Sequence, residues 1–461
     1  MNISLPDGAK EIINIFWHHG HRAYIVGGCV RDCMMGTSPN DWDIATDALP
    51  DQVMACFPGH KIIETGIKHG TITLFAASKP YEVTTFRIDG DYPDHRRPDH
   101  VNFTSCVTKD LARRDFTINA IAYHPDEGLV DPYGGAEDIQ NKIIRCVGDA
   151  DRRLGEDALR ILRALRFAAT LGFAIEQTTA NSIHRNKHLL LSISAERIRA
   201  ELCRLLVGKN AGQVLLAFAD VLGVFIPEIL PMAGFDQNNP HHYLDVWRHT
   251  VQTVVHAPPD VIVRLTMLFH DMGKPPTYTQ DEAGIGHFYG HPKVSAEMAR
   301  AILHRLKCDN ETLHTVKTLV LYHDTQIEPQ PKTVKRWLGR LGPENLGRLL
   351  SVKRADACGQ AEQFRLDRFA QIDQIASCME EILAQQQCFS LKDLQINGRD
   401  LLEMGVSQGS VIGEILRQLL DLVMDEQIEN TKIALMREAK KLLQSDNAAC
   451  QNTTPRLDTK T

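Results

Sequence analysis

The residue pattern of the chain changes near residue 145, and this change is the strongest constraint on its fold. Before it, the runs 23–28, 70–77 and 81–88 are apolar or alternate with β-branched residues, as is typical of β-strands. From about residue 148 to 232, Leu, Ala, Arg and Glu dominate and Gly and Pro are rare, which favours helix. The pattern predicts an α+β protein with its β-sheet in the N-terminal part.

A chain of 461 residues is too long for one hydrophobic core, so several domains are expected. The stretch 232–243 is rich in Gly, Asn and Pro, which is typical of a linker. The last residues, 446–461, are polar and contain Pro, which predicts disorder. The expected domains are a mixed α and β domain at 1–145 and helical domains at 146–232, 243–375 and 376–445.

Composition limits the environment and the partners. The apolar stretches are far shorter than a membrane span, and the N-terminus lacks the basic region and apolar core of a signal peptide. The 11 cysteines are odd in number and scattered, which indicates reduced thiols in a cytoplasmic protein. The net charge of −7 neither favours nor excludes a nucleic-acid partner, because phosphate binding needs only a local basic strip.

The sequence VGGCVRD, residues 26–32, is predicted to join a strand to a helix. Gly27 and Gly28 would let the backbone approach a phosphate closely, and the helix N-terminus would favour the anion. Arg31, in the first helical turn, could pair with a triphosphate. Glycines at such junctions are also common for structural reasons alone, so the motif gains weight only from its neighbours.

Asp41 and Asp43 lie two residues apart in DWDIAT, so on a strand both carboxylates would point to one face. Two adjacent carboxylates repel each other unless cations lie between them, and Mg²⁺ prefers oxygen ligands. Together with substrate phosphates, they would form a two-metal phosphoryl-transfer site. Glu82, at the start of another predicted strand, is either a third carboxylate of this site or a surface residue.

The chain up to about residue 230 resembles the class II tRNA nucleotidyltransferase and bacterial poly(A) polymerase family. The resemblance rests on the order and spacing of the two motifs above and of HGT (69–71), YEVTTFR (81–87), RRDFTINA (113–120), DPYGG (131–135), EDALRILRALRF (156–167) and SAERI (194–198). It implies a nucleotidyltransferase head of the DNA polymerase β type with a mixed β-sheet. It also implies a neck that reads the incoming base, and a helical body and tail that hold tRNA.

The segment EDALRILRALRF is predicted to form a helix with two different sides. Its apolar side would consist of Ala158, Ile161, Leu162 and Leu165 and pack inward. Its polar side would carry Asp157, Arg160, Arg163 and Arg166, one at every third position. By itself the polar side could be an exposed surface with Asp–Arg pairs, each worth only about 0.3–0.5 kcal/mol.

An Asp beside an Arg could also select nucleobases. A carboxylate only accepts hydrogen bonds and a guanidinium only donates them. Cytosine and adenine both present an amino donor beside a ring-nitrogen acceptor, whereas uracil and guanine present the reverse order and would leave buried groups unpaired. The family resemblance assigns this role to Asp157 and Arg160, and Arg163 and Arg166 are then expected to contact phosphates.

Three residues of RRDFTINA are further candidates for nucleotide binding. The resemblance places Arg114 on the nucleotide and Asp115 with Asn119 on the ribose. A charge cluster that caps a helix would be the alternative explanation. The segment 89–110 matches the loop of family members that add the terminal A, which argues against an enzyme limited to CC addition.

A second set of residues lies in the expected domain 243–375. It consists of His249, His270, Asp271, His291, His323 and Asp356, in the order that resembles HD-type metal-dependent phosphohydrolases. Imidazole and carboxylate ligands suit a divalent transition metal such as Mn, Fe, Co or Ni. Lys274 is expected to contact a phosphate, and His287 to lie just outside the ligands.

Such a domain could instead serve as a helical scaffold for tRNA without any activity of its own. If it is catalytic, 2′,3′-cyclic phosphates or 3′-phosphates on damaged tRNA ends would be suitable substrates. The segment 397–423 resembles the tail of the family and is the expected site of further RNA contact, through phosphates and shape.

The residues together predict a Mg²⁺-dependent CTP/ATP:tRNA nucleotidyltransferase that builds the 3′ CCA end without a nucleic-acid template. Its partners would be tRNA, CTP and ATP. A poly(A) polymerase and an enzyme that adds only the terminal A remain alternatives, because they share the head. An HD phosphohydrolase with a vestigial head is the alternative from another class of enzyme.

Overall fold

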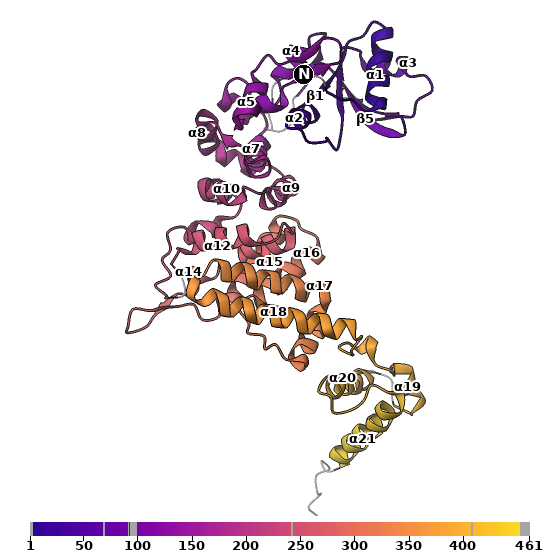
Figure 1. Cartoon of the computed structure of the whole chain (residues 1–461), viewed down its shortest axis with the longest axis vertical. Coiled ribbons are helices and arrows are strands. Elements are labelled where there is room, and N and C mark those ends of the chain that lie inside the picture. Colours follow the sequence, from indigo (N-terminus) through magenta and orange to yellow (C-terminus); the bar gives the residue numbers. More distant parts are fainter. Residues whose placement is uncertain are drawn as a thin grey trace, which may run out of the picture.

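The computed structural model describes residues 3–67, 70–90, 92, 99–240, 243–406 and 409–451. The chain forms an elongated arc, with the N-terminal head at one end and the C-terminal helices at the other (Figure 1). The fold is α+β, with its main sheet confined to the head, as the sequence predicted.

The head is built on a seven-stranded mixed sheet with the order β3-β4-β5-β2-β1-β8-β9. The strands are β1 (Ala23–Val26), β2 (Asp43–Thr46), β3 (Ile62–Gly66), β4 (Thr71–Ala76), β5 (Lys79–Thr85), β8 (Ala122–His124) and β9 (Gly128–Val130). The β2–β5 pair is parallel and the other neighbouring pairs are antiparallel. The strands predicted from the runs 23–28, 70–77 and 81–88 are therefore present as β1, β4 and β5.

Short helices surround this sheet. They are α1 (Asp7–His18), α2 (Gly28–Met34), α3 (Pro50–Cys56), α4 (Val107–Ala112), η2 (Thr117–Asn119) and α5 (Gly135–Asn141), with a side ribbon of β6 (Arg87–Asp89) and β7 (Val101–Phe103). In α1, the buried residues Ala9, Ile12, Ile13 and Phe16 follow the spacing of one helical face. This face packs on β1 and β4.

Helices dominate the next part of the chain. These are α6 (Ala150–Glu156), α7 (Leu159–Leu171), α8 (Gln177–Asn186), η3 (Lys187–Ser192), α9 (Ala195–Leu206), α10 (Ala211–Ala217), α11 (Ala219–Leu222) and η4 (Pro227–Met232), with a two-stranded ribbon of β10 (Ile143–Ile144) and β11 (Ala174–Ile175). The predicted apolar side of the second of these helices is buried, since Ala158, Ile161, Leu162 and Leu165 are at most 1% exposed.

The segment 156–167 is not one continuous helix, contrary to our expectation. The helix α6 ends at Glu156, Asp157 is extended with φ −132° and ψ 104°, and α7 begins at Leu159. The Asp157 carboxylate accepts the Leu159 backbone N–H at 3.1 Å, which satisfies one of the free donors of the new helix. The break turns Asp157 away from the spiral row that a single helix would have formed.

The body consists of α12 (Val246–His256), α13 (Val261–Phe269), α14 (Lys274–Thr277), α15 (His291–Arg305), α16 (Asn310–Tyr322), α17 (Pro331–Cys358) and α18 (Glu362–Ala384). A small hairpin of β12 (Thr279–Gln280) and β13 (Gly286–His287) precedes α15. The long α17 is kinked at Gly342, where φ is +76° and Pro343 follows. Its second half packs along α18.

The tail comprises η5 (Leu391–Asp393), α19 (Gly398–Glu403), α20 (Ser410–Met424) and α21 (Lys432–Gln451). Its hydrophobic core, which includes Leu401, Leu419 and Leu435, is separate from the core that runs through the head, the neck and the body. The helix α21 extends to Gln451, into the stretch 446–461 for which we expected disorder, and residues 452–461 lie outside the described part of the chain.

The structure also bears on the cysteines and on membrane-spanning helices. Every cysteine that the structure describes is a free thiol. Among the described residues, no helix combines the length and the apolar character needed to cross a membrane.

Candidate functional site

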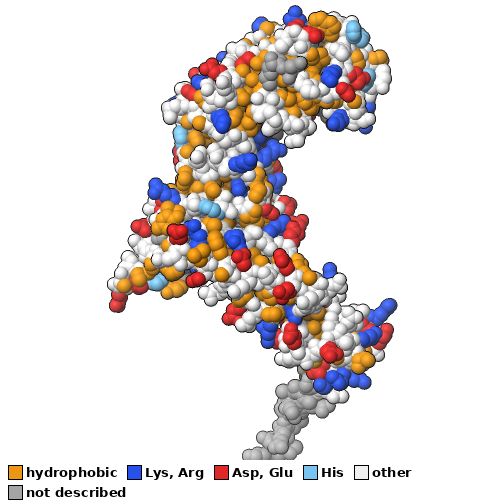
Figure 2. Space-filling model, viewed as in Figure 1, with side chains coloured by type: hydrophobic (Ala, Val, Ile, Leu, Met, Phe, Trp, Pro, Cys, Tyr) orange, Lys and Arg blue, Asp and Glu red, His pale blue; other side chains and the backbone are white. Residues whose placement is uncertain are grey.

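A cavity of about 600 Å³ lies where the head meets the neck. Its lining includes all but Glu82 of the head and neck residues singled out from the sequence, namely Gly27, Gly28, Arg31, Asp41, Asp43, Arg114, Asp115, Asn119, Asp157, Arg160, Arg163 and Arg166. In the space-filling view, Lys and Arg side chains gather beside this junction (Figure 2). The cavity lining combines carboxylates with guanidinium groups, which suits a nucleoside triphosphate with metal ions.

The carboxylates lie at the start of β2. Asp43 is the first residue of this strand, and Asp41 lies in the bend before it, not on the strand as we expected. Glu82 on β5 is the register partner of Asp43, so three carboxylates lie close together. Burial raises the pKa of Asp43; Arg114 opposes this, and the Glu82 and Asp41 carboxylates raise it further. A divalent cation would relieve this repulsion, so the donor set fits Mg²⁺.

Gly27 brings the backbone against Arg114. Its φ of +79° is rarely adopted by residues with a side chain. A Cβ atom at this position would lie 2.7 Å from the Arg114 guanidinium. The backbone conformation therefore favours glycine here, and a side chain at this position would displace the Arg114 guanidinium.

A chain of hydrogen bonds crosses the floor of the cavity. Arg31 donates to the Asn119 amide oxygen at 2.7 Å, and the Asn119 nitrogen donates to Asp115 at 3.1 Å. Arg163 donates twice to the other Asp115 oxygen, at 2.8 and 2.6 Å. Burial works to raise the pKa of Asp115, but the Arg163 charge and these hydrogen bonds outweigh it, so the pKa is lowered to about 2. The carboxylate is thus ionised and held in one orientation.

The side chains of Asp157 and Arg160 are held by other residues, and the two residues bond to each other only through the backbone, from the Arg160 N–H to the Asp157 oxygen at 2.9 Å. The Arg197 guanidinium donates to Asp157 at 3.1 Å. Arg160 donates to Glu156 at 2.8 Å and to the backbone oxygens of Arg153 and Arg113, at 2.9 and 3.1 Å. Both side chains reach the same cavity, so a carboxylate acceptor and a guanidinium donor are available to one ligand.

The two arginines that we expected to contact phosphates, Arg163 and Arg166, each form an ion pair with an acidic residue. We expected Arg163 and Arg166 to contact phosphates; Arg163 instead holds Asp115, and Arg166 forms an ion pair with Glu201 at 2.6 Å. The Arg166 guanidinium also lies 4.0 Å from the centroid of the Phe167 ring.

Three residues of the cavity wall were missed by the sequence reasoning, namely Arg113, Phe167 and Arg204. Arg113 and Phe167 stand inside motifs already noted, so their position beside Arg114 and Arg166 was an available signal. Arg204 lies on α9, far along the sequence, and no local pattern connects it to the site.

A second site lies in the body, where the six predicted ligands come together from five helices or helix ends. His249 lies on α12, His270 and Asp271 directly follow α13, His291 begins α15, His323 directly follows α16, and Asp356 lies near the end of α17. All six are buried. Five of them form two groups that share Asp271: His249 with His270, and His291 with His323. The sixth, Asp356, lies 3.1 Å from the His249 Nε2 atom.

The imidazole rings are oriented as metal ligands would be. In each of the four histidines, Nδ1 lies within 3.0 Å of a backbone oxygen, which leaves Nε2 to face the centre of the cluster. The Nε2 atoms of His249 and His270 are 3.3 Å apart, and so are those of His291 and His323. If each Nδ1 carries the proton, two lone pairs face each other in each pair, and a divalent cation between them would remove that repulsion.

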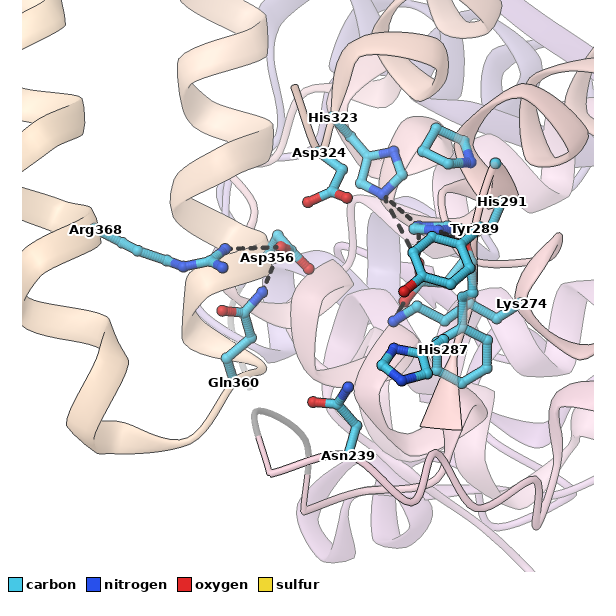
Figure 3. Close-up of a pocket in the computed structure, with 14 residues that line it drawn as sticks. Asn239, Lys274, His287, Tyr289, His291, His323, Asp324, Asp356, Gln360 and Arg368 are labelled. Atoms are coloured by element: carbon cyan, nitrogen blue, oxygen red, sulfur yellow. Dashed lines mark hydrogen bonds and ion pairs between the residues drawn. The ribbon is translucent and has the colours of Figure 1, made fainter. Parts of the chain in front are cut away.

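Lys274 and His287 both line the cavity beside the cluster. Lys274 is buried and held by Asp271 at 2.7 Å and by Gln237 at 2.8 Å, so its ammonium is already paired within the protein. His287 pairs with Asp281 at 2.9 Å on the hairpin, at the edge of the cavity beside the cluster. Asp324 and Arg368, which the sequence reasoning missed, also line that cavity (Figure 3).

Family models match three parts of the chain. Residues 23–145 match the poly A polymerase head domain, and residues 172–231 match the probable RNA and SrmB-binding site of polymerase A. Residues 277–439 match a putative tRNA nucleotidyltransferase domain 2. The first match contains the carboxylates of the head, and the third contains three of the six residues of the body cluster.

Individual proteins are similar over most of the chain or over about half of it. A CCA-adding enzyme of Lactobacillus delbrueckii subsp. bulgaricus is 32% identical over 93% of this chain and 96% of its own length. A CCA-adding enzyme of Geobacillus thermodenitrificans is 49% identical over 48% of this chain, a match that spans about half (54%) of that relative's length. The crystal structure of the Bacillus stearothermophilus CCA-adding enzyme in complex with CTP is 30% identical, with a TM-score of 0.72 over 96% of this chain and 98% of that one.

Proposed function

The chain belongs to the CCA-adding enzyme family of tRNA nucleotidyltransferases, and on that premise we propose that it adds CMP and AMP from CTP and ATP to the 3′ end of tRNA. The observation that carries this proposal is one cavity that holds both Asp41 with Asp43 and Asp157 with Arg160. The first pair suits phosphoryl transfer, and the second suits the choice of base without a template. The products are the lengthened tRNA and pyrophosphate.

Different residues of the head have different roles in nucleotide transfer. Asp41 and Asp43, with Glu82 beside them, would hold Mg²⁺, which supplies charge neutralisation on the phosphates and activation of the attacking 3′-hydroxyl. Arg31 and Arg114 bind the triphosphate, and the Gly27–Gly28 turn lets the backbone approach it. Asp115 and Asn119 accept and donate hydrogen bonds to the ribose hydroxyls, in the orientation that Arg163 and Arg31 give them.

Asp157 and Arg160 select the base. The Asp157 carboxylate accepts from the amino group of cytosine or adenine, and the Arg160 guanidinium donates to the neighbouring ring nitrogen. Uracil and guanine would place an acceptor against the carboxylate and a donor against the guanidinium. Such a mismatch leaves buried polar groups unpaired, which costs about 1–3 kcal/mol per group.

The test is incorporation by the purified chain with Mg²⁺. Labelled CTP and ATP are offered singly and together to tRNA that ends before CCA, to tRNA that ends after CC, and to an unstructured oligo(A) primer. We expect two C additions and one A addition, confined to the tRNA substrates, with no further growth. Long A tails on any primer would identify a poly(A) polymerase, and A addition only after CC would identify an A-adding enzyme.

The rest of the chain is proposed to hold and position the tRNA. We assign the head to residues 1–145, the neck to 146–232, the HD-type body to 243–375 and the tail to 376–445. A concave path along the neck, body and tail is supported by the arc of the fold (Figure 1). The free thiols of the described residues support a cytoplasmic location.

The body supports a second candidate function, that of a metal-dependent phosphohydrolase. Two groups of buried ligands that share Asp271, with Asp356 beside His249, suit two divalent ions, of which Mn, Fe, Co and Ni fit the imidazole and carboxylate set. Two adjacent ions suit hydrolysis of a phosphate ester. The proposed substrates are 2′,3′-cyclic phosphates and 3′-phosphates at damaged tRNA ends, whose removal would restore the 3′-hydroxyl that the head requires.

Hydrolysis is tested separately from nucleotide addition. The chain, loaded in turn with Mn²⁺, Co²⁺ or Ni²⁺, is incubated with tRNA that carries a labelled 3′-phosphate or 2′,3′-cyclic phosphate. We expect release of phosphate or opening of the ring by the wild type and by Asp41→Ala, but not by Asp271→Asn. Hydrolysis that persists in Asp271→Asn would contradict the assignment to this cluster.

A further inference from the structure

A cavity of about 330 Å³ opens directly on the buried histidines of the body. Figure 3 shows its two sides. Arg368 on α18 and Gln360 in the turn before α18 line one side. His287 on the hairpin and Tyr289 in the turn after the hairpin lie across from them. The volume falls at the lower end of the range for small-molecule sites, about 300–1,000 Å³.

Arg368 is the cation that this cavity offers to an anion. Its side chain is 43% exposed, and one guanidinium nitrogen lies 3.9 Å from the Asp356 carboxylate, beyond hydrogen-bond distance. The same Asp356 oxygen accepts a hydrogen bond from Gln360 at 2.8 Å. Lys274 differs from Arg368 in this respect, because Lys274 is buried and its ammonium makes two short contacts within the protein. Arg368 can therefore turn its donors to a phosphate without leaving a buried carboxylate unpaired.

Tyr289 offers a flat surface on the opposite side. Its ring is stacked on the His287 ring, with the centroids 5.3 Å apart and the planes inclined by 11°. His287 is in turn held by Asp281 at 2.9 Å. Tyr289 itself is 78% exposed, so one face of a ring supported from behind is open to a ligand. Nucleobases stack on such rings whatever their sequence identity.

We propose that this cavity binds a ribonucleoside phosphate, with the phosphate between Arg368 and the histidine cluster and the base on Tyr289. The inference rests on the proposed metal site, because the phosphate is placed where two ions would meet it. It assigns the recognition of the phosphate to α18, which lies outside the HD-type ligand set, and not to Lys274. The same chemistry is offered by a free nucleotide and by the 3′-phosphorylated end of an RNA.

The experiment measures binding of three probes to the full chain by calorimetry, with Mn²⁺ present. The probes are adenosine 3′-monophosphate, inorganic phosphate and a short RNA hairpin with a 3′-phosphate. Arg368→Gln is compared with Arg354→Gln, an arginine on the adjacent α17 that is also 43% exposed and pairs with Asp373 outside the cavity. Tyr289→Ala is compared with Tyr289→Phe, which keeps the ring.

We expect Arg368→Gln to weaken binding of all three probes by about 10-fold or more, and Arg354→Gln to leave it unchanged. Tyr289→Ala should weaken binding of the nucleotide and the RNA by about 5–10-fold but not that of inorganic phosphate, and Tyr289→Phe should restore it. Preference for the hairpin over the free nucleotide would identify RNA ends as the source of the ligand, and the reverse would identify free nucleotides. Equal affinities in Arg368→Gln and Arg354→Gln would overturn the proposal.

The metal content of each protein is measured in parallel. If the wild type binds metal but Arg368→Gln binds phosphate as tightly as the wild type does, this inference is overturned and the proposed hydrolase is not. A wild type without metal overturns the proposed hydrolase, while the comparison of the Arg368 and Tyr289 variants still decides the ligand site. The two failures are therefore distinguishable.

Discussion

Asp157 is bound by Arg197, with 3.1 Å between the carboxylate oxygen and the guanidinium nitrogen, although Arg160 is only three residues away in the sequence. Arg197 lies on α9 and Asp157 between α6 and α7, so the contact spans the neck. Arg160 is held separately by Glu156. The acceptor and the donor that we propose to read the base are thus positioned independently, each by a residue outside the pair.

The first prediction concerns base selection. Replacement of Arg197 by Met should free the Asp157 carboxylate to rotate, because one of its charged hydrogen bonds is lost. We expect the ratio of kcat/KM for CTP to that for UTP, on tRNA that lacks CCA, to fall about 10-fold. Arg185→Met is the matched control, because Arg185 forms an exposed ion pair with Asp151 elsewhere in the neck. An unchanged ratio in Arg197→Met would argue against a positioning role.

The second prediction concerns the carboxylates of the head. Asp43→Asn and Asp41→Asn keep the side-chain size but remove the charge that would hold Mg²⁺. We expect kcat for both CMP and AMP transfer to fall by about 10³-fold or more, since a catalytic metal is worth several kcal/mol in the transition state. Asp51→Asn, in the first turn of α3, should keep wild-type activity. Residual transfer close to the wild-type rate would remove these carboxylates from the mechanism.

The third prediction uses two glycines with the same backbone conformation. Gly27 and Gly20 both have φ of +79°, but a Cβ atom at Gly20 would meet nothing within 4 Å, whereas at Gly27 it would meet Arg114. Gly20→Ala should cost only the backbone strain, about 1–2 kcal/mol of stability. Gly27→Ala should have the same backbone strain and should also displace the Arg114 guanidinium. Since Arg114 is proposed to bind the triphosphate, KM for both nucleotides should rise. Thermal unfolding and steady-state kinetics separate the two effects, and equal KM values in the two variants would contradict the close approach.

The fourth prediction is a pH dependence of stability. Asp115 has its pKa lowered from 3.8 to about 2 in the folded protein, against the effect of burial, by Arg163 and Asn119. A lowered pKa stabilises the fold at pH values above about 4, and this contribution, about 2 kcal/mol, is lost as the pH falls from about 4 to 2. The difference in unfolding temperature between wild type and Asp115→Asn should therefore narrow between pH 6 and pH 3. A constant difference would show that the Asp115 charge is not coupled to folding.

The fifth prediction concerns metal stoichiometry in the body. If two ions bind, Asp271→Asn should lose both, because both groups of ligands share Asp271, while His323→Ala should lose one. His256→Ala is the matched control, since His256 is an exposed histidine at the end of the same helix as His249. Metal analysis of the purified proteins gives the counts. Chelation should also lower the unfolding temperature of the wild type, because a bound ion stabilises the native state. Equal metal content in Asp271→Asn and wild type would exclude the shared site.

Local patterns in the sequence were sufficient for the elements and for many residues of the two sites. Alternation and β-branched residues predicted β1, β4 and β5, and spacing every three or four residues predicted the buried side of α7. These signals depend on which side of a single element is covered, and neighbouring residues carry that information. The types and order of the histidines and aspartates in the body likewise predicted a ligand set from the sequence alone.

The partners of the charged side chains were decided by tertiary structure. No local pattern pairs Asp157 with Arg197, Arg166 with Glu201, or Arg163 with Asp115, because each pair joins residues at least 35 positions apart that meet only in the folded head and neck. The break between α6 and α7 at Asp157 was missed for a different, local reason, because the Asp157 carboxylate accepts the Leu159 backbone N–H. A helix that is continuous by propensity can be interrupted when one side chain caps the next helix.

The sequence by itself determined which chemical groups the chain brings to each site: carboxylates and arginines in the head, imidazoles and carboxylates in the body. Tertiary structure alone decided which of these groups are held by the protein and which remain available to a ligand. Lys274 and Arg368 line the same cavity, but Lys274 is buried against Asp271, while Arg368, from a helix without any motif, is partly exposed there. A charge in a folded protein is satisfied by whichever opposite group the packing brings near it, and that distance is set by the whole fold.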